Sequence, residues 1–171
     1  MLYLKCTNEV QKTIGLKKAN LAAASSSEAA LGNWYINRFV IGRTNIFIFM
    51  SDVTLLSFIL FQGKKPVTAE RLPNMMLGGL DQLLKMRSFS DLSIHKALEP
   101  YTVGLFAKTD SRSDLGSLND LINCYRDMIE FEGGLDNCNL TSIIMKVNDM
   151  PQRKLNWRTS WDATTQRLLG H

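Results

Sequence analysis

The densest polar segment of the chain runs from residue 109 to residue 120 and contains three serines, three aspartates and one arginine. It lies between an expected strand and an expected helix. Backbone N–H groups at the start of a helix, with arginine and hydroxyl groups beside them, can hold a phosphate or a carboxylate. The segment therefore predicts a site for a small anionic ligand. Its candidate ligand-binding residues are Ser111, Arg112, Ser113, Ser117, Asn119 and Asp120.

The same segment also fits a structural role, in which its hydroxyl groups cap the helix. Ser117 and Asp120 have the spacing of a capping box, where the hydroxyl accepts from a backbone N–H and the carboxylate reaches back. Ser113 is the rival cap if the helix begins one turn earlier, and Arg112 then pairs with a nearby aspartate. No glycine-rich phosphate-binding pattern accompanies the segment. The structural role is therefore the preferred interpretation.

Asn33, Trp34 and Tyr35 form a second cluster, at the start of an expected strand. Successive side chains of a strand point to opposite faces, so the two rings must separate. The preferred structural interpretation buries one ring and leaves the other partly exposed. The functional interpretation makes the rings a wall of a ligand pocket, with Asn33, Asn37 or Arg38 as hydrogen-bonding groups. Asn33, Trp34 and Tyr35 are therefore kept as ligand-binding candidates.

Histidine and cysteine are too sparse to form a recognisable catalytic or metal site. The histidines are His95 and His171, and the cysteines Cys6, Cys124 and Cys138 show no CxxC spacing. A nucleophile–histidine set would need one of these histidines in a suitable context. Nothing groups histidine, cysteine and carboxylates at metal-ligand spacing. We therefore expect no metal and no cofactor, lean against an enzyme, and interpret the cysteines as reduced thiols.

The chain carries 20 basic and 16 acidic residues, which gives a net charge of +4. The excess lies in residues 1–72, which hold nine basic and four acidic residues. If these basic side chains share one face, they can bind the phosphates of a nucleic acid. A basic and aromatic run at residues 153–158 adds to this hypothesis. A charge of +4 also falls in the range that merely keeps a small domain soluble, so nucleic acid ranks behind the other partners.

A chain of 171 residues with 45% hydrophobic residues fits one domain, residues 1–171. Hydrophobic periodicity predicts strands at 2–6, 34–41, 46–50, 54–61, 101–107 and 140–147, and helices at 8–14, 72–84, 91–98, 115–129 and 160–169. Residues 20–31, rich in alanine and serine, are expected to form a surface loop. This order favours an α+β fold, in which an antiparallel strand meander packs against several helices.

The most apolar region, residues 39–61, raises the question of a membrane span, which needs about 20 uninterrupted apolar residues. Polar residues at 42–45 and 51–52 cut this region into strand-sized pieces. Lys17 and Lys18 stand where the apolar core of a signal peptide would lie. We therefore expect a cytoplasmic protein without a membrane partner.

Three motifs occur in the order Leu4-Lys5-Cys6-Thr7, Leu31-Gly32-Asn33-Trp34-Tyr35 and the block from Ser111 to Asp120. Together they resemble a family of small bacterial proteins known only as a domain of unknown function. The third motif is the most specific, and the resemblance spans most of residues 1–170. Where the family begins with Arg-Cys-Thr, this chain has Lys5-Cys6-Thr7. The resemblance implies a bacterial, cytoplasmic, single-domain protein and supplies no activity.

Three functional hypotheses follow, in order of preference. The first is a non-enzymatic binding or interaction protein that self-associates, because the expected strands are apolar on both faces and the chain is rich in methionine and phenylalanine. The second is an enzyme or sensor that binds a small anion at residues 111–120. There Arg112, Ser113 and Asn119 hold the ligand, and Asp120 orients it or acts as a base. The third is a nucleic-acid-binding protein that uses the basic N-terminal half.

Overall fold

The sheet of this protein has five strands in the order β4-β3-β2-β1-β5, as seen in a computed structural model that describes residues 1–102 and 104–170. The strands are β1 (Leu2–Cys6), β2 (Trp34–Ile41), β3 (Thr44–Ser51), β4 (Ser57–Phe61) and β5 (Gly104–Lys108). β2, β3 and β4 form an antiparallel meander, whereas β1 runs parallel to both β2 and β5. The predicted α+β fold with a strand meander is therefore confirmed, with a mixed rather than purely antiparallel sheet.

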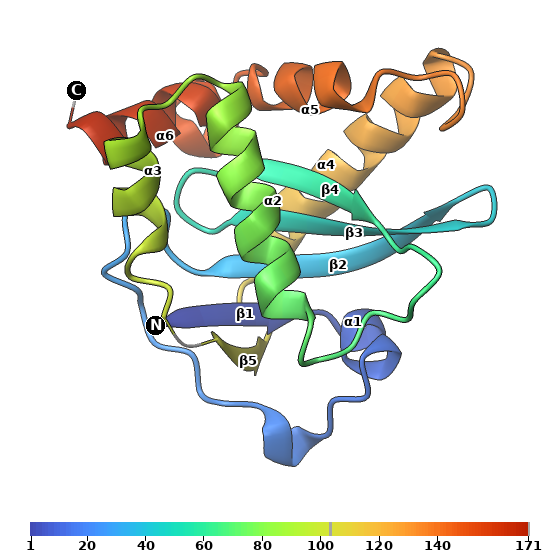
Figure 1. Cartoon of the computed structure of the whole chain (residues 1–171), viewed down its shortest axis with the longest axis vertical. Helices are drawn as coiled ribbons and strands as arrows, with labels where there is room; N and C mark the ends of the chain where they lie inside the picture. The colour runs from blue at the N-terminus through green and yellow to red at the C-terminus, as the bar shows by residue number, and fades with distance from the viewer. Residues whose placement is uncertain (103, 171) are drawn as a thin grey trace.

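Helices cover both faces of this sheet. They are α1 (Asn8–Thr13), α2 (Leu72–Met86), α3 (Asp91–Leu98), α4 (Arg112–Phe131), α5 (Leu140–Asn148) and α6 (Ser160–Leu169), with short 3-10 turns at Lys18–Asn20 and Arg153–Leu155. α2 crosses one face and α4 lies behind the other, while α3, α5 and α6 gather along one edge (Figure 1). Phe47 and Ile48, which point to opposite faces of β3, are both fully buried. The apolar strand faces that suggested self-association are thus covered by helices of the same chain. No helix in the described ranges is both long and apolar enough to span a bilayer.

The sixth strand expected at residues 140–147 is wrong, because this segment is the helix α5. Its β-branched residues favour a strand locally. However, the Asn139 side chain accepts a hydrogen bond from the Ser142 backbone N–H at 3.1 Å and caps a helix. Ile143, Ile144 and Val147 then fall on one buried helical face. Burial at helical spacing outweighs the local strand preference.

Several boundaries differ from the sequence prediction; the strand expected at 101–107, for example, is observed at Gly104–Lys108. The run expected as a strand from residue 54 becomes a strand only at Ser57, because the Ser51 hydroxyl accepts from the backbone N–H groups of Val53 and Thr54 and folds a tight turn. The last helix has the expected bounds, and the side chain of Thr159 caps it by accepting from the Asp162 backbone N–H.

A buried polar contact fastens α5 and α4 to the edge strand β4. The Asn148 side chain accepts from the Ser57 backbone N–H at 2.9 Å and donates to the Ser57 carbonyl at 2.8 Å. The Ser57 hydroxyl also shares a 2.8 Å hydrogen bond with the Tyr125 hydroxyl. The amide of Asn148 therefore pairs with the strand edge as a neighbouring strand would, and so protects it.

Alanine substitution at the two adjacent glycines in the middle of α2 should change the stability of the fold in opposite directions. A Cβ at Gly79 would lie 2.4 Å from Cε2 of Phe58, so the helix packs this closely on β4 only without a side chain there. A Cβ at Gly78 meets nothing within 4 Å. We expect Gly79→Ala to destabilise the fold by about 1–3 kcal/mol through overpacking. Gly78→Ala should stabilise it by up to about 1 kcal/mol through helix propensity. Urea unfolding of the two variants checks this, and a gain in stability at both positions would contradict it.

Candidate ligand-binding site

The residues predicted at the start of β2 are all buried. Trp34 and Tyr35 are both inaccessible to solvent, so neither ring is partly exposed as the structural interpretation expected. The Trp34 indole donates to the Tyr101 hydroxyl at 3.1 Å, and that hydroxyl donates to the Gly32 carbonyl at 2.6 Å. The Asn33 amide donates to the Ser25 carbonyl at 2.8 Å, which ties the Ala/Ser-rich loop to the sheet. These contacts are structural.

Tyr35 nevertheless connects the two clusters that the sequence singled out. Its hydroxyl donates to a carboxylate oxygen of Asp110 at 2.6 Å, just before α4. Lys5 on β1 lies beside Tyr35, with its ammonium 3.1 Å from Asp110 and 3.5 Å from Asp52. Asp52 in turn accepts from the backbone N–H of Asn33 at 3.0 Å. One buried lysine therefore joins the ends of β3 and β5.

Burial and charge move the pKa values of this network in opposite directions. Burial raises the pKa of Asp52 above its usual range, although the Lys5 charge and the Asn33 N–H oppose the rise. Desolvation would also raise the pKa of Asp110, but hydrogen bonds from Tyr35 and Lys5, together with the Lys5 charge, outweigh it and lower the pKa. Burial, followed by the bond to Asp110, raises the pKa of Tyr35. Asp110 therefore stays ionised and Tyr35 stays a donor.

The predicted block from Ser111 to Asp120 is helical rather than a loop. Ser111 is the cap, and its hydroxyl accepts from the Asp114 backbone N–H at 3.1 Å. The expected caps at Ser113 and at Ser117 with Asp120 are therefore wrong, because α4 begins before both. The Ser117 hydroxyl donates instead to the Ser113 carbonyl at 3.3 Å. A helix spaces these side chains around its axis, so they do not converge on one point as a loop would allow. Arg112, Ser113, Asn119 and Asp120 are all exposed.

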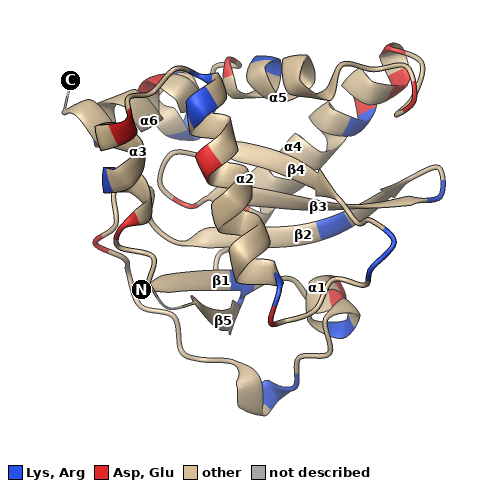
Figure 2. Cartoon of the chain, viewed as in Figure 1, with Lys and Arg blue, Asp and Glu red and all other residues tan. Residues whose placement is uncertain are grey.

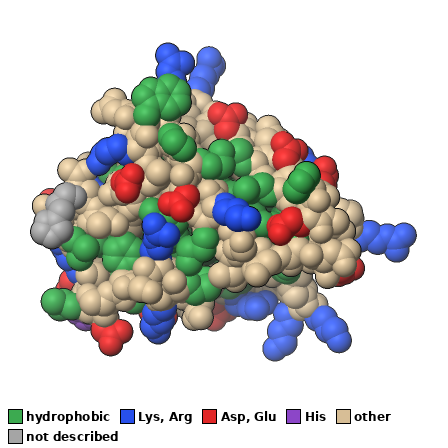
Figure 3. Space-filling view, turned by 90° about the horizontal axis from the view of Figure 1, so that it is seen from above, with side chains coloured by type: hydrophobic (Ala, Val, Ile, Leu, Met, Phe, Trp, Pro, Cys, Tyr) green, Lys and Arg blue, Asp and Glu red, His purple; other side chains and the backbone are tan. Residues whose placement is uncertain are grey.

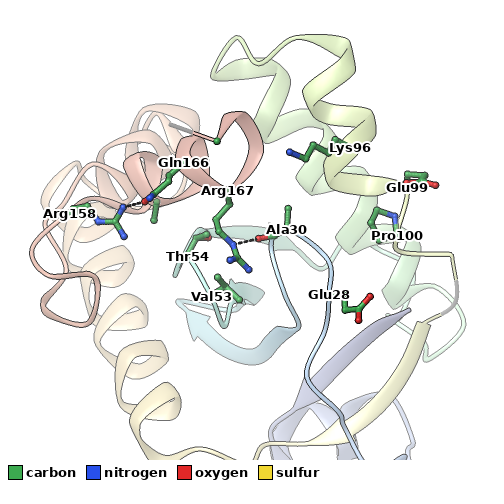
Figure 4. A pocket seen from close by; sticks show the side chains of 12 residues that line it. Glu28, Ala30, Val53, Thr54, Lys96, Glu99, Pro100, Arg158, Gln166 and Arg167 are labelled. Atoms are coloured by element: carbon green, nitrogen blue, oxygen red, sulfur yellow. Dashed lines mark hydrogen bonds between the residues drawn. The ribbon is translucent and has the colours of Figure 1, made fainter.

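A cavity of about 800 Å³ opens instead between α3, α6, the loop at residues 28–30 and the turn after β3. Three basic side chains line it, namely Lys96 of α3, Arg167 of α6 and Arg158, which precedes α6. Glu28 and Glu99 are its acidic residues. Figure 4 shows Arg158 at one end of the cavity and Glu99 at the other, with Arg167 between them. This volume lies within the range of small-molecule pockets.

Backbone carbonyls hold two of these cations in place. The Arg167 Nε donates to the Ala30 carbonyl at 2.8 Å, which leaves its two Nη groups for other partners. The Lys96 ammonium donates to the Leu168 carbonyl at 3.0 Å and keeps two further N–H groups. Arg158 donates to the Gln166 side chain. Between residues 1–102 and 104–170, none of the three basic residues forms an ion pair.

The turn after β3 joins this cavity to the Lys5 network. Asp52 belongs to the network, whereas the next two residues, Val53 and Thr54, line the cavity. The Ser51 hydroxyl donates to the Leu31 carbonyl at 2.6 Å, and Asp52 and Asn33 exchange hydrogen bonds. The cavity floor is therefore fixed by the same contacts that hold Lys5.

Sequence reasoning missed Lys5, Asp52 and the three basic residues of the cavity. Lys5 carried one local signal, since it is a lysine in an otherwise apolar strand. Arg158 belongs to the basic run at 153–158, but no local pattern groups it with Lys96, which lies more than sixty positions away. Only folding brings the two into one cavity. The described part of the chain also holds no group of three His, Cys, Asp or Glu side chains arranged for a metal ion.

The basic residues of the N-terminal half are spread over several elements. Figure 2 places them at the tip of the β2–β3 hairpin, on the loop after β4, on α1 and on the 3-10 turn. Arg38 forms an ion pair with Glu9, in which Nη1 of Arg38 lies 2.6 Å from Oε1 of Glu9. In the run at 153–158, Lys154 pairs with Asp114, while Trp157 is 67% exposed in a left-handed backbone conformation. Nucleic-acid binding stays a prediction.

Comparison with known proteins identifies a family and distant structural likenesses. A family model described as "Domain of unknown function (DUF6933)" matches residues 3–163. No curated protein matches the chain. Among solved structures, the catalytic core domain of BIV integrase is similar with a TM-score of 0.49 and 11% identity, over 78% of this chain and 93% of that one. That likeness is too low to support an argument about function.

Proposed function

Since the chain belongs to this family of unknown function, as the motif resemblance implied, we propose from its own cavity that it is a non-enzymatic protein that binds a small anionic ligand. One observation carries the proposal. Lys96, Arg158 and Arg167 line one cavity of about 800 Å³ and form no ion pair within residues 1–102 and 104–170. A ligand with a phosphate or carboxylate group supplies the missing partner.

The arrangement of donors supports an anion over a neutral ligand. The Nη groups of Arg167 form a planar fork that matches the oxygens of a phosphate or carboxylate. Its Nε is already fixed on the Ala30 carbonyl, so less side-chain freedom is lost on binding. Glu28 and Glu99 line the same cavity and limit its excess charge to one positive unit, which favours a ligand with few charges.

Binding of inorganic phosphate, followed by calorimetry at low ionic strength, tests the proposal. We expect Arg167→Ala to raise the Kd about tenfold, the loss expected for one charge-assisted hydrogen bond. Arg158→Ala, which leaves the Arg167 bond to Ala30 intact, should also weaken binding. Arg43→Ala is the matched control, since it removes the same charge from the exposed tip of the β2–β3 hairpin. Added salt should weaken binding of wild-type protein.

Arg112→Ala distinguishes this cavity from the start of α4, the other candidate for an anion. If the ligand occupies the cavity, Arg112→Ala leaves the Kd unchanged. A large loss with Arg112→Ala and none with Arg158→Ala or Arg167→Ala would move the site to α4 and refute the cavity. No binding of phosphate or of a dicarboxylate such as succinate to wild-type protein would refute anion binding altogether.

We also propose that the protein acts in the cytoplasm of a bacterium. Cys6, Cys124 and Cys138 are unpaired thiols, which supports a reducing compartment. Burial raises the pKa of the Cys6 thiol to about 12, so this thiol is a packing group rather than a nucleophile. Inaccessibility of Cys6 to a thiol reagent in folded protein is the expected result.

A further inference from the structure

A second, apolar groove lies at the end of α4, where that helix meets α5. The groove has a volume of about 490 Å³ and is lined by Met128, Phe131 and Ile143, with Asp127, Glu132 and Lys146 around them. None of these residues lines the cavity described above. Figure 1 shows the end of α4 extending to one side of the sheet, with α5 running back from it along the edge. Glu130, Phe131 and Glu132 at this end of α4 are exposed.

Phe131 is the most exposed large hydrophobic residue in the described ranges, at 92%. A phenylalanine ring that becomes covered removes roughly 150–250 Å² from water, so an exposed ring beside an apolar groove favours association. The same patch thus presents a side chain that can insert and a groove that can receive one. On the face that carries α5, hydrophobic side chains reach the surface among acidic and basic ones (Figure 3).

Charges of both signs surround the groove and are free to pair with a partner. Asp127, Glu132 and Lys146 form no ion pair with one another or with other described residues. In a two-fold contact the same patch faces itself, so the lysine of one copy meets an acidic residue of the other. Such a contact requires a side chain that inserts, a groove that receives it and charges of both signs. This patch carries all three.

We propose that this patch is the interface of a symmetric dimer, in which Phe131 of each copy enters the groove of the other. The partner is a second copy of this chain, because Lys146 of one copy can pair with Glu132 of the other across a two-fold axis. The dimer is independent of the anion cavity, and either proposal can fail alone.

Sedimentation equilibrium across the micromolar range tests the dimer. Wild-type protein should dimerise, and Phe131→Asp should raise the dimer Kd about 30-fold or more, as for a central interface residue. Phe131 is almost fully exposed in the monomer, so this variant should fold with unchanged thermal stability of the monomer. Leu92→Asp is the matched control, since Leu92 is 78% exposed on α3 and does not line the groove. Its dimerisation should equal that of wild type.

A charge exchange shows whether the partner is a second copy. Lys146→Glu and Glu132→Lys should each weaken the homodimer through like-charge repulsion. A mixture of the two variants should form a heterodimer, because each charge then meets its opposite across the two-fold axis. A monomeric wild-type protein, unchanged dimerisation of Phe131→Asp, or no recovery in the mixture would each overturn the proposal.

Discussion

Replacement of Lys5 by methionine should lower the free energy of unfolding at neutral pH by about 2 kcal/mol, less than for a fully buried ion pair because Asp52 and Asp110 keep part of their solvent exposure. Methionine keeps the length of the side chain, so the packing on β1 is largely preserved. Lys5 is only 7% exposed, and its ammonium lies within 3.5 Å of both Asp52 and Asp110. Without it, the partly buried Asp52 loses its only ion-pair partner among the described residues.

The pH dependence separates this electrostatic loss from a packing loss. The Lys5 charge opposes the burial that raises the pKa of Asp52, so Lys5→Met should raise that pKa further. An aspartate with a raised folded pKa binds its proton more readily when folded, and the variant therefore regains stability as pH falls. In wild type, the lowered pKa of Asp110 stabilises the fold above its unfolded pKa, and this contribution is lost as pH falls through the folded pKa. Both effects make the difference in unfolding free energy between wild type and Lys5→Met smaller at low pH.

Urea unfolding at about pH 7 and about pH 4, near the pKa of free aspartate, measures the effect. The stability difference between wild type and Lys5→Met should be clearly smaller at the lower pH. Lys85→Met is the control, because Lys85 pairs with Asp81 on the exposed side of α2 and should cost little at either pH. An equal loss for Lys5→Met at both values would show that Lys5 acts through packing and not through its charge.

Gly32→Ala should also destabilise the fold by about 3 kcal/mol or more, because a left-handed backbone and a steric clash both oppose it. Gly32 has a φ of +69°, and a Cβ there would lie 2.3 Å from Asp52 Oδ1 and 2.4 Å from Val53 Cγ2. The same Asp52 oxygen accepts the Asn33 N–H. The substitution therefore displaces the turn that forms the cavity floor, and anion binding should weaken with stability.

Gly15→Ala isolates the backbone contribution to this loss. Gly15 has a φ of +73° at the end of α1, and a Cβ there meets nothing within 4 Å. Its substitution should cost about 1 kcal/mol, the strain of a left-handed residue alone. Thermal unfolding of both variants gives the comparison. Equal losses at the two glycines would mean that the turn yields to the added carbon and that the close approach at Gly32 is unimportant.

The sequence by itself determined the elements whose pattern is local. The alternation of Leu2–Cys6 and the aromatic run Trp34–Ile41 appear as strands with the expected bounds, and Asp91–Leu98 is a helix with the expected bounds. The meander followed from three apolar runs separated by short turns. The sequence pattern also singled out Tyr35 and the region from Asp110 onward, and in the fold a hydrogen bond joins Tyr35 to Asp110. Side-chain periodicity and caps act over a few residues, so a single chain reveals them.

Only the tertiary structure decided the rest. Residues 140–147 form a helix because Ile143 and Val147 face the core at helical spacing, although their types favour a strand. The parallel placement of β1 between β2 and β5 depends on pairings far apart in the chain. The Lys5 network and the Lys96, Arg158 and Arg167 cavity arise in the same way. The energies of these two sites come from charge interactions and burial between segments that are distant in the sequence. Such contacts form only when the chain folds, so they leave no local pattern in the sequence.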